Sequence, residues 1–476
     1  MTKTGRALIG GLLAASALVA PGSAWAKPLS VEARLQRLEA EMKGLRGDLE
    51  ATRAENDQLK KRAADAEARA ALAEGQAVDA SKRVAVLEAK PAPAPAPVQA
   101  DGFKSGNTQI KLGGYIKLIG SSTRFSDGEV ATNSLGRDFY LPQSIPTDGK
   151  PAAHDTDFTA KQSRFWLNLD SNVAGKTVKG YLEFDFQTSP GTQGSQRTTN
   201  GYNPALRRAY MQIDRWTFGQ EWTTFQYTGA LPESTDYVGG AEGTVFVRQP
   251  QIRYSAPLGG GATLHIAAEN PESGTATVGS ATLVENGDDR LPDFAARLAW
   301  AGKAGELSLA GLARQVRVED KDTGMSTQTA GYGVSLGGKL FLNEAKSGDA
   351  RFMVTYGRNI GRYVGLNFAP DAVLDANNKL HSANVFAVIG AVRVPVVSSV
   401  RFNLMGSYQN VDYADELTTT QIGAFNKQAW SAAANLFYSP VKNIDLGVEY
   451  RHGERDLVDG KDGSTDRIDV VAKYSF

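Results

Sequence analysis

The stretch Arg467–Phe476, RIDVVAKYSF, alternates in polarity up to the end of the chain. One face of an extended chain would carry the apolar residues Ile468, Val470, Ala472, Tyr474 and Phe476. The opposite face would carry the polar residues Arg467, Asp469, Lys473 and Ser475. Successive side chains of a β-strand point to opposite faces, so this stretch predicts a strand with one apolar and one polar face.

A strand of this kind, ending in an aromatic residue, resembles the signal that ends outer-membrane β-barrel proteins. The composition of the 476 residues agrees with such a barrel, because beyond the N-terminus no apolar run reaches the ~18–20 residues of a membrane helix. Lipid-facing residues of a barrel alternate with polar ones, which hides them from a hydropathy scan. The chain has no Cys, and its zero formal net charge gives no basic bias towards nucleic acid.

Residues 1–26 have the pattern of a secretory signal peptide. Lys3 and Arg6 precede the apolar run Ala7–Ala20, and Ala24-Trp25-Ala26 has the small residues of a cleavage site. The alternative is a single membrane anchor, for which the apolar run is too short. The pattern therefore predicts export and removal of this segment.

Residues 27–90 show a heptad pattern that predicts an α-helical coiled-coil stem. With Leu35 at position a, eight heptads run without a slip, and the polar Asn56 at an a position is expected to fix the register. The alternative is a lone charged helix, and the heptads do not decide between two and three strands. Residues 91–102 follow as a Pro/Ala linker, a composition that favours extended polyproline II.

Residues 103–476 predict an all-β transmembrane barrel of about sixteen antiparallel strands. Apolar residues recur at every second position, as in Phe165, Leu167 and Leu169. A soluble sandwich would alternate too, but here short and long connections take turns, as in barrels with short periplasmic turns and long external loops. Long connections are expected at Ser122–Phe158, Thr188–Ala205, Trp222–Arg248, Asn270–Pro292, Glu319–Thr327, Arg358–His381, Asp412–Lys427 and Glu454–Thr465. This order predicts an aqueous channel with the stem in the periplasm.

Arginines at inward positions are the candidate pore-lining residues. By strand alternation they are Arg164, Arg208, Arg253, Arg297, Arg351 and Arg401. Rings of Arg favour anions in channels, and the guanidinium group can fork around a carboxylate or phosphate. The alternative is that these arginines pair with lumen acids, among them Glu183 and Asp185, and only support the wall.

The third long connection, Trp222–Arg248, is the predicted constriction loop. It carries Glu233, Asp236 and Glu242, and acids facing an arginine wall would set up a field across the pore. The alternative is an ordinary external loop. Elsewhere the four histidines are scattered, and no Walker, HExxH or GxSxG motif is present. The sequence therefore predicts no catalytic residues, cofactor or metal, although a barrel hydrolase without a visible triad stays open.

Four stretches resemble the DcaP-like porins of the Gram-negative outer membrane. They are Lys111–Leu118, Arg208-Ala209-Tyr210, Gly219–Phe225 and Arg248–Tyr254. The resemblance covers nearly all of the mature chain. It implies a homotrimer, sixteen strands per subunit, a preference for small anions such as dicarboxylates, and a place near the narrow zone for Arg208, Arg248 and Arg253. The chain departs from the family pattern at Glu221, where a neutral residue is expected.

The sequence thus predicts an outer-membrane porin for passive diffusion of small polar solutes, with a preference for dicarboxylate-like anions. The predicted partners are the other subunits of a homotrimer and outer-membrane lipid. One alternative is a tether, in which the coiled coil binds peptidoglycan and the barrel is an anchor. A second alternative is a phosphate-selective porin, which shares a basic lumen.

Overall fold

The computed structural model describes residues 102–132, 134–187 and 201–476, with six isolated residues at 32, 43, 57, 60, 61 and 64. The chain divides into two compact units, Met1–Val98 and Gln99–Phe476. The predicted signal peptide (1–26), coiled coil (27–90) and linker (91–102) lie outside the described residues, apart from the six isolated positions and residue 102. Within the described residues, no helix combines the length and apolar character needed to cross a membrane.

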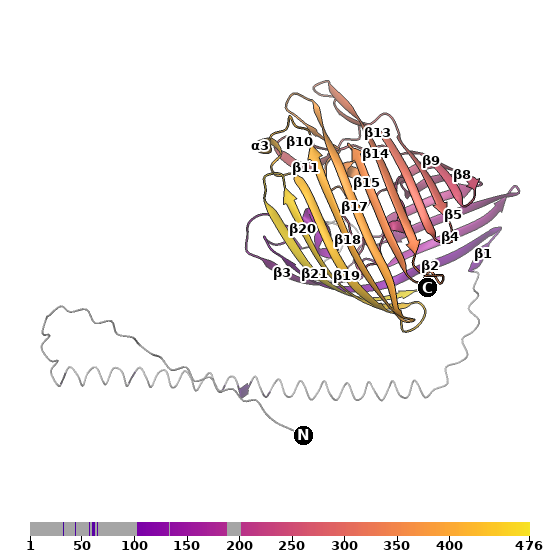
Figure 1. The fold of residues 1–476 in the computed structure, drawn as a ribbon, viewed down its shortest axis with the longest axis horizontal. Coiled ribbons are helices and arrows are strands. Elements are labelled where there is room, and N and C mark those ends of the chain that lie inside the picture. The colour runs from indigo at the N-terminus through magenta and orange to yellow at the C-terminus, as the bar shows by residue number, and fades with distance from the viewer. Residues whose placement is uncertain are drawn as a thin grey trace. The chain divides into compact units, whose positions relative to one another are not determined.

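The second unit is a closed antiparallel β-barrel of 16 wall strands (Figure 1). The strands are β1 (Phe103–Ser105), β2 (Thr108–Phe125), β3 (Ala153–Thr159), β4 (Arg164–Val173), β5 (Lys176–Asp185), β6 (Ala205–Ile213), β7 (Trp216–Trp222), β8 (Arg248–Gly259), β9 (Ala262–Glu269), β10 (Gly274–Thr277), β11 (Ser280–Glu285), β12 (Asp293–Ala301), β13 (Gly305–Asp320), β14 (Met325–Phe341), β15 (Asp349–Arg358), β16 (Ala372–Leu374), β17 (Leu380–Val397), β18 (Val400–Tyr413), β19 (Asn426–Tyr438), β20 (Ile444–Leu457) and β21 (Asp462–Ser475). The short helices are α2 (Leu135–Asp138), η1 (Pro142–Ser144), η2 (Thr228–Ala230), η3 (Gly361–Tyr363) and α3 (Thr419–Ile422).

Strand pairing explains how these elements make the barrel wall. The first half of β2 pairs with β4 and its second half with β3, so β3 and β4 form one wall strand interrupted at residues 160–163. β1 extends β2, while β10 and β16 pair in parallel in a small sheet that also contains β11. β21 pairs with β2, which closes the wall and removes free strand edges. The predicted barrel of about sixteen strands is confirmed.

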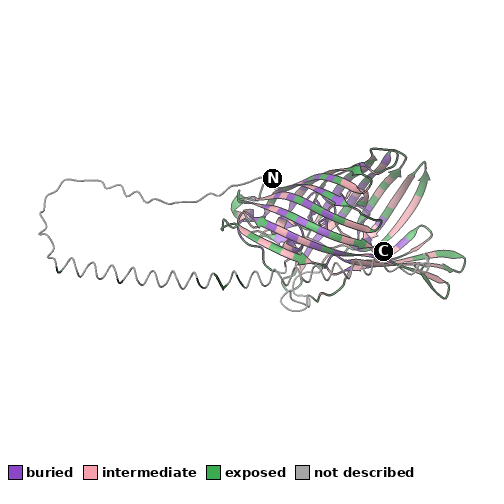
Figure 2. Cartoon of the chain, turned by 90° about the horizontal axis from the view of Figure 1, so that it is seen from below, coloured by how far each residue is buried: buried purple, intermediate pink, exposed green. Residues whose placement is uncertain are grey.

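The C-terminal strand has the predicted two faces. Ile468 and Val470 are 49% and 58% exposed on the outside, whereas Arg467 and Asp469 are buried on the inside. The same alternation of buried and exposed residues runs along neighbouring strands (Figure 2). A soluble sandwich would bury the apolar face, so the soluble alternative is wrong.

Two of the predicted long connections are short turns instead. The predicted loops Glu319–Thr327 and Glu454–Thr465 shrink to residues 321–324 and 458–461, because β13, β14, β20 and β21 extend further than expected. In the first case the ladder continues up to the pair Asp320 and Met325. Charged side chains do not end a strand, since the antiparallel ladder satisfies the backbone whatever the side chains are.

Three long connections fold over or into the barrel: loop 1 (residues 126–152), loop 3 (223–247) and loop 6 (359–379). Loops 3 and 6 meet in a β-bridge between Val245 and Val364. Their apolar side chains, among them Phe225 and Tyr363, pack in one buried cluster with inward strand residues such as Met353. Part of the interior is therefore filled by loops.

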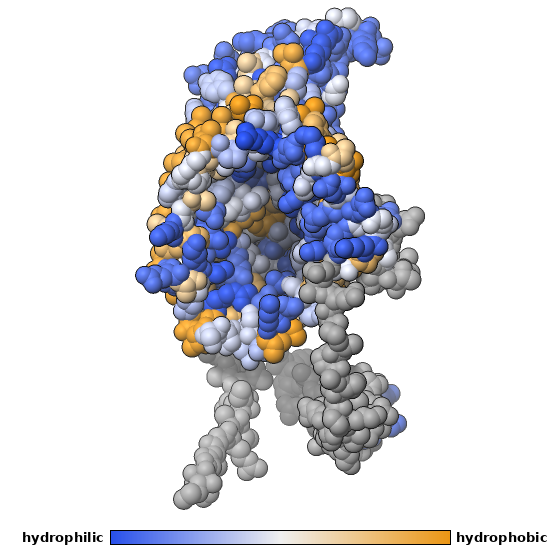
Figure 3. Space-filling model, turned by 90° about the vertical axis from the view of Figure 1, so that its right-hand side faces the viewer, coloured by the Kyte–Doolittle hydropathy of each residue, from blue (hydrophilic) through white to orange (hydrophobic). Residues whose placement is uncertain are grey.

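The rest of the interior is open and polar. In Figure 3 the visible face is hollowed, with hydrophilic residues around the hollow and hydrophobic residues along the outer belt. The polar side chains that face inward are consequently the candidates for contact with a solute.

Candidate functional site

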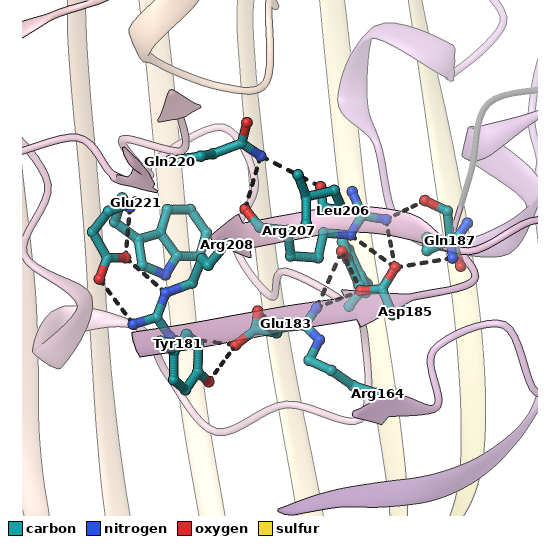
Figure 4. A network of polar contacts seen from close by, with 12 residues as sticks. Arg164, Tyr181, Glu183, Asp185, Gln187, Leu206, Arg207, Arg208, Gln220 and Glu221 are labelled. Atoms are coloured by element: carbon teal, nitrogen blue, oxygen red, sulfur yellow. Dashed lines mark hydrogen bonds and ion pairs between the residues drawn. The ribbon is translucent and has the colours of Figure 1, made fainter. Parts of the chain in front are cut away.

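A cluster of charged residues lies on the inner wall of β4–β7 (Figure 4). Cross-strand register places Arg164 opposite Asp185 and Arg208 opposite Glu183. The Arg164 guanidinium lies 2.7 Å from Asp185 and 3.3 Å from Glu183. Arg208 lies 3.3 Å from Glu183 and 2.7 Å from Glu221 on β7. The structure thus brings together these five predicted residues.

Arg207 belongs to this cluster and was missed by sequence reasoning. The register shifts between Glu183 and Phe184, which pair with Arg208 and Leu206, so Arg207 is the extra residue of a β-bulge. Its guanidinium lies 2.6 Å from Asp185. Strict alternation would place Arg207 on the membrane face, and no local signal in the sequence predicts the bulge.

The charges of this cluster balance. Arg164, Arg207 and Arg208 face Glu183, Asp185 and Glu221, and each arginine has an ion pair with at least one of these acids. A buried ion pair is stable only when both partners are present, since a single buried charge without a partner is strongly unfavourable. The alternative weighed from the sequence, pairing of lumen arginines with lumen acids, describes Arg164 and Arg208.

Three other predicted arginines have no ion pair with a described acid. Arg253 donates hydrogen bonds to Thr224 Oγ1 (2.9 Å) and Gln251 Oε1 (3.0 Å). Arg297 donates to the backbone oxygen of Gln226 at 2.7 Å. Arg253 and Arg297 lie on β8 and β12, the two strands that flank β9. Their direct hydrogen-bond partners are neutral, so among the described residues neither positive charge is held in an ion pair.

Arg248 is held by aromatic rings. Its guanidinium lies 3.7 Å from the centre of the Trp222 ring and 5.0 Å from that of Phe246. The two rings are 4.8 Å apart and nearly perpendicular. Its buried Nε has no hydrogen-bond partner among the described residues. Cation–π contacts hold the group in place without neutralising it.

Loop 3 reaches the β4–β7 cluster through Tyr237. Its hydroxyl donates to Asp185 at 3.0 Å and accepts from Arg164 at 3.1 Å. Burial raises the pKa of Tyr237, against the lowering effect of Arg164, so the phenol stays neutral and keeps its proton for Asp185. This contact joins loop 3 to the inner wall.

In the described part of the chain, the acids of loop 3 contact β18 and loop 1, and not the strands that carry Arg208 and Arg253. Glu233 lies 2.7 Å from Arg401, itself a predicted wall arginine. Glu242 accepts from Ser407 Oγ at 2.7 Å, and Asp236 accepts from the backbone N–H of Tyr140 at 3.2 Å. Glu233, Asp236 and Glu242 therefore anchor loop 3 to β18 and loop 1.

The predicted wall residue Arg351 is also paired, with Asp349 on the same strand, β15.

Among the described residues, no group of His, Asp and Glu side chains is arranged to hold a metal ion. An open polar interior inside a sixteen-stranded barrel with an apolar outer face defines the class of outer-membrane diffusion channels. The fold indicates a channel.

The chain belongs to the DcaP outer membrane protein family, whose model matches residues 72–476. The fold is similar to that of the outer membrane channel DcaP of Acinetobacter baumannii, with 26% identity and a TM-score of 0.65 over 79% of this chain and 100% of that chain. OmpT of Vibrio cholerae is more distant, with 11% identity and a TM-score of 0.47 over 79% of this chain and 100% of that one. Comparison with curated protein sequences gave no match. The resemblance drawn from the sequence is confirmed, and the protein is an outer-membrane porin.

Proposed function

We propose that this porin admits small polar solutes by passive diffusion and prefers anions. The observation that carries the proposal is the group Arg248, Arg253 and Arg297, whose charges no described acid neutralises. Fixed positive charge in a narrow, low-dielectric passage attracts anions and repels cations. The balanced β4–β7 cluster is proposed to line the same passage without determining whether anions or cations are preferred.

The proposal includes loop 3 as the constriction. Its residues contact β2, β5, β15, β18 and β20 through hydrogen bonds of Thr235, Tyr237, Leu231, Glu233 and Ser234. A loop attached at so many points around the wall narrows the lumen and leaves a passage against the arginines. Dicarboxylate-like anions fit that passage because two carboxylates can bind separate guanidinium groups.

The N-terminal unit is proposed to be periplasmic. β2 begins at the barrel end that carries the short turns, such as residues 174–175 and 214–215. In this class of barrel the short turns face the periplasm. Residues before β2 then lie on the periplasmic side, where the predicted coiled coil is proposed to support a homotrimer.

The test is the reversal potential of the full chain in a planar bilayer under a KCl gradient. We expect a chloride preference that falls in Arg253→Gln combined with Arg297→Gln. The matched control is Arg208→Gln combined with Glu221→Gln, which removes one balanced pair and keeps the preference. A potassium preference in the unmodified protein, or no change in the first double variant, contradicts the proposal. Competition between succinate and phosphate then separates a dicarboxylate porin from a phosphate-selective one.

A further inference from the structure

A cavity of about 460 Å³ lies where loops 1, 3 and 6 meet loop 4 (residues 270–292). Its volume is within the range of small-molecule sites. The cavity lies apart from the balanced β4–β7 cluster and from Arg253 and Arg297, none of which lines it. It is therefore a separate candidate binding site on the long-loop side of the barrel.

Most of the cavity wall is apolar. The apolar side chains that line it come from four different loops and include Leu135, Phe139, Leu141, Phe246, Leu283 and Leu366. Several of them also pack in a cluster with Tyr140 and Val238, which fixes the wall from behind. A wall of this kind favours apolar groups, since burying apolar surface is the main source of binding free energy.

Two arginines line the cavity, and Arg248 is the one that has no ion pair with an acid among the described residues. Arg362 lies 3.3 Å from Asp293 and also donates to Gln249 and to backbone oxygens. Arg248 has neither a described carboxylate partner nor a hydrogen-bond acceptor for its buried Nε. Trp222 and Phe246 pack on its guanidinium and hold it in position. The cavity thus offers one uncompensated positive charge.

Two acids lie on the loop 4 side. The Glu272 carboxylate accepts from the backbone N–H of Gly287 at 3.0 Å, and Glu285 is exposed at the end of β11. A second anionic group of a ligand would meet these acids, the apolar wall or Arg362, whose charge is already paired with Asp293. The acids repel such a group and the apolar wall removes its hydration, and the Arg362 pair leaves little net positive charge to compensate either cost.

We infer that this cavity binds a carboxylate monoanion with an apolar body, with the carboxylate on Arg248 and the body against the leucine and phenylalanine side chains. The inference rests on the proposed function, because it treats the cavity as a site that anions occupy before they enter the passage. It adds a ligand class that differs from small dicarboxylates. Arg248 fixes the carboxylate so that the apolar body of the ligand contacts the wall, and discrimination between ligands therefore needs both the arginine and the apolar side chains.

The experiment uses the full chain in a planar bilayer, with hexanoate, acetate or succinate added on the long-loop side. The measured quantity is the concentration that reduces the single-channel current by half. Burial of the four additional methylene groups predicts that hexanoate acts at a concentration at least about tenfold below that of acetate. Succinate is expected to resemble acetate.

Three variants locate the site. Arg248→Gln is expected to abolish the advantage of hexanoate over acetate, and Arg248→Lys to restore part of it. Leu141→Ser should reduce the same ratio while leaving the acetate value unchanged. The matched control Arg253→Gln removes another uncompensated charge, and it should lower chloride preference in KCl without changing the hexanoate-to-acetate ratio.

Equal half-blocking concentrations for hexanoate and acetate would overturn the inference, as would a stronger effect of succinate or an unchanged ratio in Arg248→Gln. Failure of the proposed function has a different signature, which is a reversal potential in KCl that favours potassium. If hexanoate blocks selectively but the reversal potential favours potassium, the binding site is supported and the proposal of an anion-selective channel is refuted.

Discussion

Arg314 and Asp371 form an ion pair of 2.7 Å in which neither side chain has exposed surface. Arg314 lies on β13 and Asp371 in loop 6, so the pair holds this loop against the inner wall. Asp371 also accepts hydrogen bonds from the backbone N–H groups of Gly274 and Arg362. One carboxylate thus connects the wall with loops 4 and 6.

We predict that Asp371→Asn loosens loop 6. Arg314 would keep only its longer ion pair with Asp293, at 3.4 Å, so the loss of the Asp371 charge costs up to about 3 kcal/mol. The variant should show faster amide hydrogen exchange in residues 359–379 and a larger, noisier single-channel conductance. Glu416→Gln is the control, because its pair with Lys379 is exposed and contributes little. Unchanged exchange in Asp371→Asn would contradict the role given to this pair.

Glu221 offers a second prediction, because its carboxylate forms the shorter of the two ion pairs of Arg208, at 2.7 Å against 3.3 Å for Glu183. Glu221→Gln should release the charge of Arg208 and increase the preference for chloride. One charge about 4 Å from an ion changes its energy by about 1 kcal/mol in water, which is about a fivefold change in the ratio of ions. The reversal potential in a KCl gradient measures it. Adding Arg208→Gln should return the value to that of the unmodified protein, and a lasting increase would point to another origin.

The third prediction concerns the pH dependence of loop 4. Burial raises the pKa of Asp289, whose Oδ1 accepts from Ser273 Oγ while its buried Oδ2 has no partner among the described residues. The folded state therefore binds the proton more tightly than the unfolded one, so loop 4 gains stability as pH falls through the raised pKa. Amide hydrogen exchange in residues 270–292, compared between acidic and neutral pH after correction for intrinsic rates, measures this effect. Asp289→Asn should remove the dependence; if the dependence persists, another group titrates.

Closure of the barrel by the last residue gives the fourth prediction. Gly114 and Phe476 exchange two backbone hydrogen bonds, of 3.0 and 3.2 Å, and a Cβ at Gly114 would lie 2.9 Å from the Phe476 ring. Deletion of Phe476 or the change Gly114→Ala should lower the free energy of unfolding in detergent, and the deletion should lower it by about 1–3 kcal/mol for two lost hydrogen bonds. Gly311→Ala is the control, because a Cβ there meets no neighbour. Equal stability of the Gly114 and Gly311 variants would count against tight closure.

Much of the fold could be predicted from the sequence. Sixteen strands were predicted from the alternation of polarity in segments such as Arg467–Phe476 and from the regular order of short and long connections. This works because side-chain direction in a strand is a local property of the backbone. The loop bounds near residues 321–324 and 458–461 were wrong, since strand ladders continue past the apolar belt. The segments before residue 102 stay predictions.

The candidate site was predicted as a set of residues and not as an arrangement. The sequence pointed to Arg208, Arg253 and Glu221, but gave no way to tell that Arg208 is neutralised by Glu221 while Arg253 has neutral partners. Arg207 escaped notice because a bulge breaks the alternation on which inward positions were assigned. The loop 3 acids proved to be anchors, among them Glu233 on Arg401.

The sequence by itself determined the class of the molecule: a closed barrel with an apolar outside, a polar inside and the motifs of its family. Those features depend on the spacing of residues along the chain, which any extended strand converts into faces. Only the tertiary structure decided which charges cancel, that loop 6 fills the interior beside loop 3, and that Arg248 lies at an apolar cavity. Charge balance depends on distances of a few ångströms between residues far apart in the chain, and such distances are fixed only when the wall closes and the loops pack inside it.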